Sequence, residues 1–256
     1  MQMIQINGNA LHVQHIPGPS QAAALVFLHE GLGSISMWRD WPAQVCTATA
    51  RPAWVYSRLG YGQSSPLVDV RGAGRLKPDY MHEQAFDVLP GLLARLGVRQ
   101  PPVLIGHSDG ATIALLYASR YEVSACIAMA AHLFVEDISL QAIQAARTAY
   151  VQGPLRERLA RHHADVESAF WQWNDAWLNP QFHSFDIRAQ CRQIRAPVLA
   201  MQGIDDEYGS LEQLHEISRA VPHAQTMVLN NCGHSPQRDQ PALITQVIAQ
   251  FLQNCP

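Results

Sequence analysis

The chain has 256 residues and a net charge of −3; 48% of its residues are hydrophobic and 15% are charged. This composition is typical of a globular protein, and the length is sufficient for a full core in one large domain. The slightly acidic balance excludes the basic footprint expected of a protein that binds nucleic acid or an anionic membrane surface.

The predicted elements begin with a hairpin: residues 3–6 and 11–15 flank a turn at Asn7-Gly8-Asn9. Short apolar runs and helical patterns then alternate along the chain. Strands are predicted at residues 23–28, 54–56, 103–105, 125–130, 198–201 and 226–229, and helices at 85–96, 111–120, 211–220 and 242–252. This alternation predicts an α/β fold with a mostly parallel sheet, helices on both faces, and strand carboxyl ends along one edge, where sites form.

Residues 132–196 interrupt this alternation. They contain a helical pattern at 140–150, a Gly153-Pro154 break and a long helical stretch from 155 to about 178. We expect them to form a helical cap inserted into a core domain made of residues 1–131 and 197–256. Three tryptophans, Trp171, Trp173 and Trp177, either pack in the interior or line a pocket between cap and sheet.

The sequence Gly-His-Ser-Asp-Gly at 106–110 lies between a predicted strand and a predicted helix. In that context Ser108 occupies a sharp turn that exposes its hydroxyl at the carboxyl edge of the sheet, and the glycines leave room for the turn. The free N–H groups at the start of the following helix suit an oxyanion. We therefore interpret Ser108 as a candidate nucleophile.

A serine hydroxyl becomes a strong nucleophile when a histidine takes its proton and a carboxylate orients that histidine. In this kind of sheet the chain order is serine, acid, histidine. His234 follows the last predicted strand, and two acids, Asp205 and Asp206, follow the strand at 198–201. We favour Asp206 as the acid because it lies three residues after Gly203. The other aspartate is then a solvated loop charge or a helix cap.

The loop after the strand at 23–28 begins His29-Glu30-Gly31 and is rich in glycine. The backbone N–H of Gly31 is predicted to form an oxyanion hole with the N–H of Asp109. The alternative is a flexible turn between a strand and a helix.

These motifs together resemble those of α/β-hydrolase-fold enzymes with a helical cap, over essentially the whole sequence. The resemblance is carried by His29-Glu30-Gly31, the Gly-Tyr-Gly-Gln-Ser turn at 60–64, the pentapeptide at 106–110, Gly203-x-x-Asp206 and Gly233-His234. It implies that Gly31 supplies an oxyanion N–H and that Asp206 is the acid. The chain departs from the family pattern at Glu30, where glycine is usual, and at Ser57, where aspartate is frequent. The first departure adds a charge near the pocket, and the second weakens any transfer of a relative's substrate.

Other residues near strand ends are candidates for substrate contact. They are Glu30, Arg58 and His132, together with the three tryptophans Trp171, Trp173 and Trp177. Arg58 either binds a substrate carboxylate or pairs with a nearby acid. His107, beside the serine, is expected to pack rather than to react.

We therefore expect a serine hydrolase without cofactor or metal that cleaves a carboxylic ester, lactone or thioester of a small molecule through an acyl-enzyme. The His-Glu pairs of the chain have no second histidine four residues later, so no metal-binding helix is indicated. The alternatives are a carbon–carbon bond hydrolase acting on a ring-fission product, a cofactor-free lyase or synthase, and a non-catalytic binding module on the same fold.

The amino-terminal residues, the apolar runs and the cysteines indicate the cellular compartment in which the protein is expected to act. The first eight residues do not resemble a secretory signal, and no apolar run reaches the length that spans a bilayer. The five cysteines are odd in number and include no Cys-x-x-Cys pair, which indicates free thiols. We expect a cytoplasmic protein that acts on a small molecule and has neither a nucleic-acid nor a membrane partner.

Overall fold

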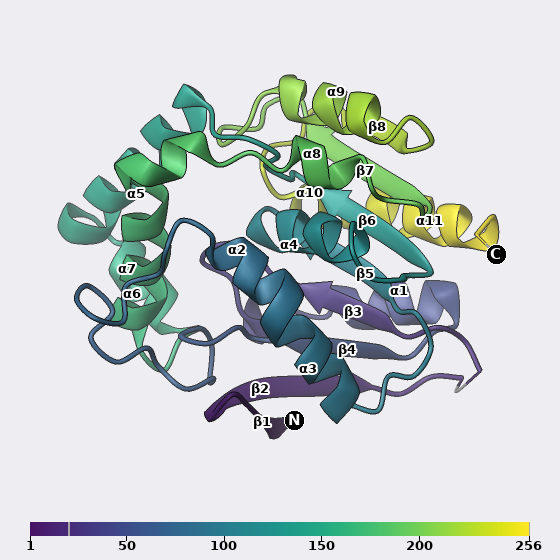
Figure 1. Cartoon of the computed structure of the whole chain (residues 1–256), viewed down its shortest axis with the longest axis horizontal. Coiled ribbons are helices and arrows are strands. Elements are labelled where there is room, and N and C mark those ends of the chain that lie inside the picture. The colour runs from purple at the N-terminus through teal and green to yellow at the C-terminus, as the bar shows by residue number, and fades with distance from the viewer. Residues whose placement is uncertain (20, 256) are drawn as a thin grey trace.

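The computed structural model describes residues 1–19 and 21–255. Within them, eight strands form one sheet in the order β1-β2-β4-β3-β5-β6-β7-β8 (Figure 1). The pairs β1–β2 and β2–β4 are antiparallel and the other neighbours are parallel. The strands are β1 (Gln2–Ile6), β2 (Asn9–Ile16), β3 (Leu25–Leu28), β4 (Ala53–Tyr56), β5 (Val103–His107), β6 (Ala125–Met129), β7 (Val198–Gly203) and β8 (Gln225–Leu229). The predicted hairpin and mostly parallel sheet are confirmed.

Helices cover both faces of the sheet (Figure 1). One face carries α2 (Tyr80–Glu83), η2 (Gln84–Val88), α3 (Leu89–Arg95), α4 (Asp109–Ala118) and α9 (Leu211–Ala220), and the other carries α1 (Trp41–Thr49) and α11 (Pro241–Gln253). Leu104 and Ile105 of β5 belong to different apolar clusters because successive side chains of a strand point to opposite faces. The short elements η1 (Ile35–Trp38) and α10 (Pro236–Asp239) lie in loops. No helix of the described residues has both the length and the apolar character needed to cross a bilayer.

The sequence analysis did not predict α1. Its residues include Val45, Thr47 and Thr49, and β-branched side chains have a low intrinsic preference for helix. Burial of Trp41 and Val45 against the sheet stabilises the helix instead. Tertiary packing therefore outweighs local propensity in this segment.

The chain between β6 and β7 forms α5 (Asp137–Gln152), α6 (Leu155–Ala160), α7 (Val166–Trp177), η3 (Pro180–Ser184) and α8 (Arg188–Cys191). Helices α5, α6 and α7 lie together beyond the carboxyl ends of the parallel strands, and α8 returns to pack near α4 and α9 (Figure 1).

The predicted continuous helix from 155 to about 178 is wrong, because residues 161–165 interrupt it. Asp165 begins α7 as its N-cap and accepts a hydrogen bond from the Ser168 amide at 2.9 Å. Within the interruption, His163 Nδ1 accepts from the Gly62 amide at 2.9 Å and Nε2 donates to the Leu32 carbonyl at 3.0 Å. The break thus joins the inserted helices to two loops of the core.

Candidate active site

Ser108 lies at the turn between β5 and α4 with φ 53° and ψ −120°. A residue with a side chain rarely adopts this positive φ, and such a conformation costs about 1–3 kcal/mol. The flanking glycines are needed for close approach: a Cβ at Gly106 collides with the carbonyl oxygen of Gly110, and a Cβ at Gly110 collides with that of Leu28. The pentapeptide therefore forms the strained strand-to-helix turn that the sequence predicted.

Three side chains from separate loops form one hydrogen-bonded chain. Ser108 Oγ lies 2.9 Å from His234 Nε2, and His234 Nδ1 lies 2.8 Å and 3.0 Å from the two carboxylate oxygens of Asp206. Asp206 follows β7 and His234 follows β8, so the parallel strands deliver both residues to the edge that carries the serine. In this arrangement His234 can accept the serine proton while Asp206 holds its ring.

Local hydrogen bonds fix the orientation of Asp206. Its Oδ2 accepts from the Gln202 amide group at 2.6 Å and its Oδ1 accepts from the Tyr208 backbone N–H at 2.8 Å. Burial raises the pKa of Asp206, but the bond from His234 and this backbone donor outweigh it, so the pKa is lowered overall. The neighbouring Asp205 is exposed, and Asp206 is the aspartate that faces His234.

Gly31 follows β3 and lines the same cavity as Ser108, while Asp109 is the first residue of α4. A Cβ at Gly31 collides with the indole of Trp173, so only glycine fits between this loop and α7. Of the two predicted oxyanion donors, Gly31 therefore shares the cavity with Ser108 and is covered by α7, and Asp109 directly follows Ser108 in the chain.

A cavity of about 100 Å³ lies over Ser108. Its walls are mostly apolar or aromatic. They include Ile143, Trp173 and Trp177 from the inserted helices, His132 from the loop between β6 and α5, and Leu32, Tyr208, Glu30 and His107 from the core. The sequence analysis missed Leu32, Ile143 and Tyr208. The position of Tyr208, two residues after Asp206 in the same loop, could have indicated that it lies near the site. No feature of the sequence indicated this for Ile143.

Three polar side chains of the cavity wall, Glu30, His107 and His132, have shifted pKa values. Burial raises the pKa of Glu30, but His107, whose Nδ1 lies 3.4 Å from Glu30 Oε2, outweighs it and lowers the pKa to about 2. The same pairing raises the pKa of His107 against its own burial, and His107 Nε2 donates to the His234 carbonyl at 2.6 Å. Burial lowers the pKa of His132 to about 3, so its ring is neutral. Among the described residues, His132 Nδ1 has no hydrogen-bond partner.

Two predicted contact residues, Arg58 and Trp171, do not line this cavity, and for Arg58 the structure shows the alternative, a pairing with a nearby acid. The guanidinium of Arg58 is buried, donates to the carbonyl oxygens of His29 and Glu30, and lies 3.8 Å from Asp109 Oδ2. Its partners are thus protein atoms.

Trp171 is only half-buried. Its indole donates to Glu167 at 2.8 Å, and the Arg71 guanidinium lies 3.9 Å from its ring centre. Trp171 therefore packs against charged surface side chains, away from the serine.

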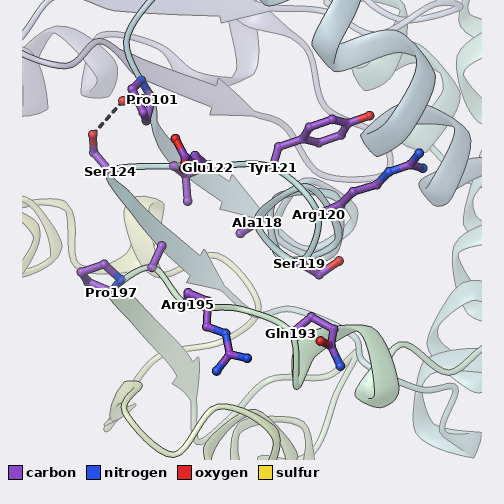
Figure 2. A pocket seen from close by; sticks show the side chains of 12 residues that line it. Pro101, Ala118, Ser119, Arg120, Tyr121, Glu122, Ser124, Gln193, Arg195 and Pro197 are labelled. Atoms are coloured by element: carbon purple, nitrogen blue, oxygen red, sulfur yellow. Dashed lines mark hydrogen bonds between the residues drawn. The ribbon is translucent and has the colours of Figure 1, made fainter.

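A larger depression of about 500 Å³ lies at the opposite, amino ends of the strands and is lined by residues such as Pro101, Arg120, Ser124 and Arg195 (Figure 2). There the Ser124 hydroxyl donates to the Pro101 carbonyl at 2.7 Å. Its lining contains no histidine or cysteine beside a hydroxyl nucleophile. In the part of the chain that the structure describes, no group of three or more His, Cys, Asp or Glu side chains is arranged to hold a metal ion. The cavity over Ser108 is therefore the candidate active site.

The sheet order, the strained serine turn and the position of the histidine after the last strand define an α/β-hydrolase fold. Residues 25–247 match the alpha/beta hydrolase family, and the chain belongs to that family of hydrolases.

Among curated relatives, the chain is 24% identical to the mouse sn-1-specific diacylglycerol lipase ABHD11 over 266 residues, covering 93% of this chain and 83% of the lipase. It is 30% identical to the proline iminopeptidase PfmaB of Pestalotiopsis fici over 122 residues, which cover 47% of this chain and 40% of that enzyme.

Solved structures show the same fold. A thermophilic esterase from Thermogutta terrifontis superposes with a TM-score of 0.77 at 19% identity, covering 99% of this chain and 98% of the esterase. The enol-lactonase from Burkholderia xenovorans LB400 gives a TM-score of 0.76 at 20% identity, covering 99% of this chain and all of the lactonase (100%).

Proposed function

We propose that the protein is a serine hydrolase that cleaves a carboxylic ester, lactone or thioester of a small molecule through an acyl-enzyme. The observation that carries this proposal is the hydrogen-bonded chain from Ser108 through His234 to Asp206. Its first member, Ser108, lies at a strained turn and lines a cavity. Relatives and structural neighbours that are an esterase, a lactonase and a lipase support an ester-type bond.

In the proposed reaction, Ser108 Oγ attacks the substrate carbonyl carbon while His234 Nε2 takes the hydroxyl proton. The N–H groups of Gly31 and Asp109 stabilise the oxyanion that forms on the carbonyl oxygen. The tetrahedral intermediate collapses, and the departing alcohol or thiol takes the proton from His234. A water molecule that His234 deprotonates then attacks the acyl-enzyme and releases the acid and Ser108.

The small cavity favours a short acyl group. Ligand sites for drug-sized molecules measure about 300–1,000 Å³, well above the volume of about 100 Å³ found here. We further propose that residues 132–196 act as a cap that sets this limit, since Ile143, Trp173 and Trp177 form part of the wall. The free thiols of the five cysteines support a reducing, cytoplasmic location.

The test combines active-site labelling with a substrate panel. A fluorophosphonate probe should label the wild-type protein and fail to label Ser108→Ala. Short p-nitrophenyl esters, lactones, thioesters and ring-fission dienoates are then assayed side by side, with hydrolysis of at least one ester-type substrate expected. Cleavage of the dienoate alone would make the protein a carbon–carbon bond hydrolase, and absence of labelling would make it a non-catalytic member of the fold.

A further inference from the structure

A buried guanidinium lies behind the loop that carries the first oxyanion donor. Arg58 follows β4, and its side chain is 3% exposed. It donates hydrogen bonds to the carbonyl oxygens of His29 and Glu30, the two residues that precede Gly31. Because one planar guanidinium binds both carbonyls, it fixes the backbone path on which the direction of the Gly31 N–H depends.

The backbone of Arg58 strengthens this contact. Its amide donates to His29 Nε2 at 3.0 Å, so His29 carries its proton on Nδ1 and donates it to the Glu30 carbonyl at 2.7 Å. Burial lowers the pKa of His29 well below its usual value, which keeps the ring in the neutral form that this pattern requires. The loop before Gly31 is thus held by three hydrogen bonds from two side chains.

The same guanidinium faces the residue that carries the second donor. Arg58 Nη2 lies 3.8 Å from Oδ2 of Asp109, whose side chain is completely buried. The Tyr80 hydroxyl donates to that Oδ2 at 2.6 Å, and the Trp177 indole donates to Oδ1 at 3.2 Å. The Asp109 carboxylate therefore joins the serine turn to α2, to Arg58 and to α7 of the cap.

We propose that Arg58 and Asp109 are positioning residues whose side chains set the distance between the two oxyanion donors. Through the hydrogen bond from Trp177 to Asp109, this distance also depends on the position of the cap. This inference rests on the proposed function. Neither side chain belongs to the described wall of the cavity, so each acts through the backbone N–H groups of Gly31 and Asp109.

The expected effect is on the transition state. Oxyanion donors work at about 2.7–3.1 Å from the developing charge, so a small shift of either amide weakens a bond that the bound substrate does not yet make. Loss of one donor costs about 10²–10³ in kcat. A displaced donor should cost part of that factor and leave KM nearly unchanged.

Tyr80→Phe is the main test because it removes one hydrogen bond to Asp109 and Tyr80 does not line the cavity around Ser108. We expect kcat for a short ester to fall about tenfold, with KM changed by less than about twofold. The inhibition constant of a trifluoromethyl ketone, which forms a tetrahedral oxyanion on the serine, should rise by the same factor as kcat/KM falls. A purely structural hydrogen bond does not produce this parallel change.

Tyr56→Phe is the matched control. Tyr56 is 1% exposed, and its hydroxyl has no hydrogen-bond partner among the described residues, so the control removes a buried hydroxyl without removing a hydrogen bond of the cluster. It should leave kcat and inhibitor affinity unchanged. Arg58→Lys extends the test: it keeps the charge but loses the planar group that binds two carbonyls, and kcat should fall about a hundredfold.

Unchanged kcat and inhibitor affinity in folded Tyr80→Phe, even with a lower melting temperature, would show that the cluster only stabilises the fold. A rise in KM alone would likewise overturn the inference, because it would place the cluster in ground-state binding. Failure of the proposed function has a different signature, in which the wild type itself hydrolyses no ester and the fluorophosphonate probe does not label Ser108.

Discussion

Ser108 combines an unfavourable backbone conformation with a well-placed side chain. Its φ of 53° is strained, yet the turn puts Oγ 2.9 Å from His234 Nε2. Relaxing the turn would move the hydroxyl away from its base. The strained turn therefore places a buried nucleophile at the cavity wall and aligns it with its base.

Ser108→Ala should abolish hydrolysis and leave the fold intact. Loss of a triad nucleophile lowers turnover by a factor on the order of 10⁶, whereas removal of one hydroxyl leaves the turn and its glycines unchanged. The measurements are kcat on a short p-nitrophenyl ester and the melting temperature of both proteins. Activity above a few per cent of wild type at an unchanged melting temperature would contradict the assignment.

Asp206 and Asp205 provide an internal comparison at adjacent positions. Asp206→Asn should lower turnover by roughly 10⁴, because an amide no longer holds the His234 ring in the required tautomer. Asp205→Asn should cost less than about tenfold, because the Asp205 side chain is exposed. Steady-state kinetics of the two variants are compared directly. A larger effect at Asp205 would reverse the roles of the two aspartates.

At the scale of elements, strands and turns with strong local signals were predicted well. The β5–α4 turn was readable because glycines, a serine and a change of periodicity coincide within residues 103–118. The loops after β7 and β8 were readable because chain order in a parallel sheet fixes which loops meet. In contrast, α1 and the interruption at 161–165 depend on burial and on contacts with distant loops, which local sequence does not encode.

Individual contact residues were harder to predict for the same reason. The main partners of Arg58 are backbone carbonyls brought near by the fold, so no sequence pattern distinguishes it from a substrate-binding arginine. The tryptophans did carry a signal. Trp173 and Trp177 are four residues apart and share a helix face, whereas Trp171 lies on a different face. Only the first two line the cavity.

Trp173→Ala should shift substrate preference toward bulky acyl groups. The indole forms part of the wall of a cavity of about 100 Å³, and its removal enlarges that space. We expect kcat/KM for a bulky ester to rise relative to acetate by about 1–3 kcal/mol, even if the loss of a buried tryptophan lowers stability by about 3–5 kcal/mol. The measurement is kcat/KM on acetate and bulky esters, alongside melting temperature.

Trp171→Ala is the control for this experiment, because Trp171 is half-buried and lies outside the cavity. Its preference for bulky over short esters should equal that of the wild type. A shift in Trp171→Ala together with none in Trp173→Ala would refute the proposed role of the cap wall.

At the scale of the whole molecule, buried neutral histidines tie stability to pH. Burial lowers the pKa of His132 to about 3 and that of His163 to about 4, whereas an unfolded histidine titrates near pH 6.5. Between pH 6.5 and 4 these two histidines therefore bind protons in the unfolded chain but stay neutral in the folded chain. The free energy of unfolding should fall as the pH falls, by up to about 1.4 kcal/mol per pH unit for each such group. The pKa of His107 is raised, so this residue makes the free energy of unfolding rise as the pH falls. Its effect is opposed by both His132 and His163.

The dependence of the free energy of unfolding on pH should be weaker when His163 is replaced. In His163→Gln the side chain can still accept from Gly62 and donate to Leu32, so the link between residues 161–165 and these two loops is preserved while the titrating group is removed. Urea unfolding of both proteins at several pH values between 7.5 and 5 measures the slope. The variant should lose less stability than the wild type over this range, because one proton fewer is taken up on unfolding. Equal slopes in the two proteins would mean that His163 binds its proton over the same pH range in the folded and the unfolded chain, and as the pH falls the folded protein would then carry a charged imidazole that cannot accept the Gly62 hydrogen bond.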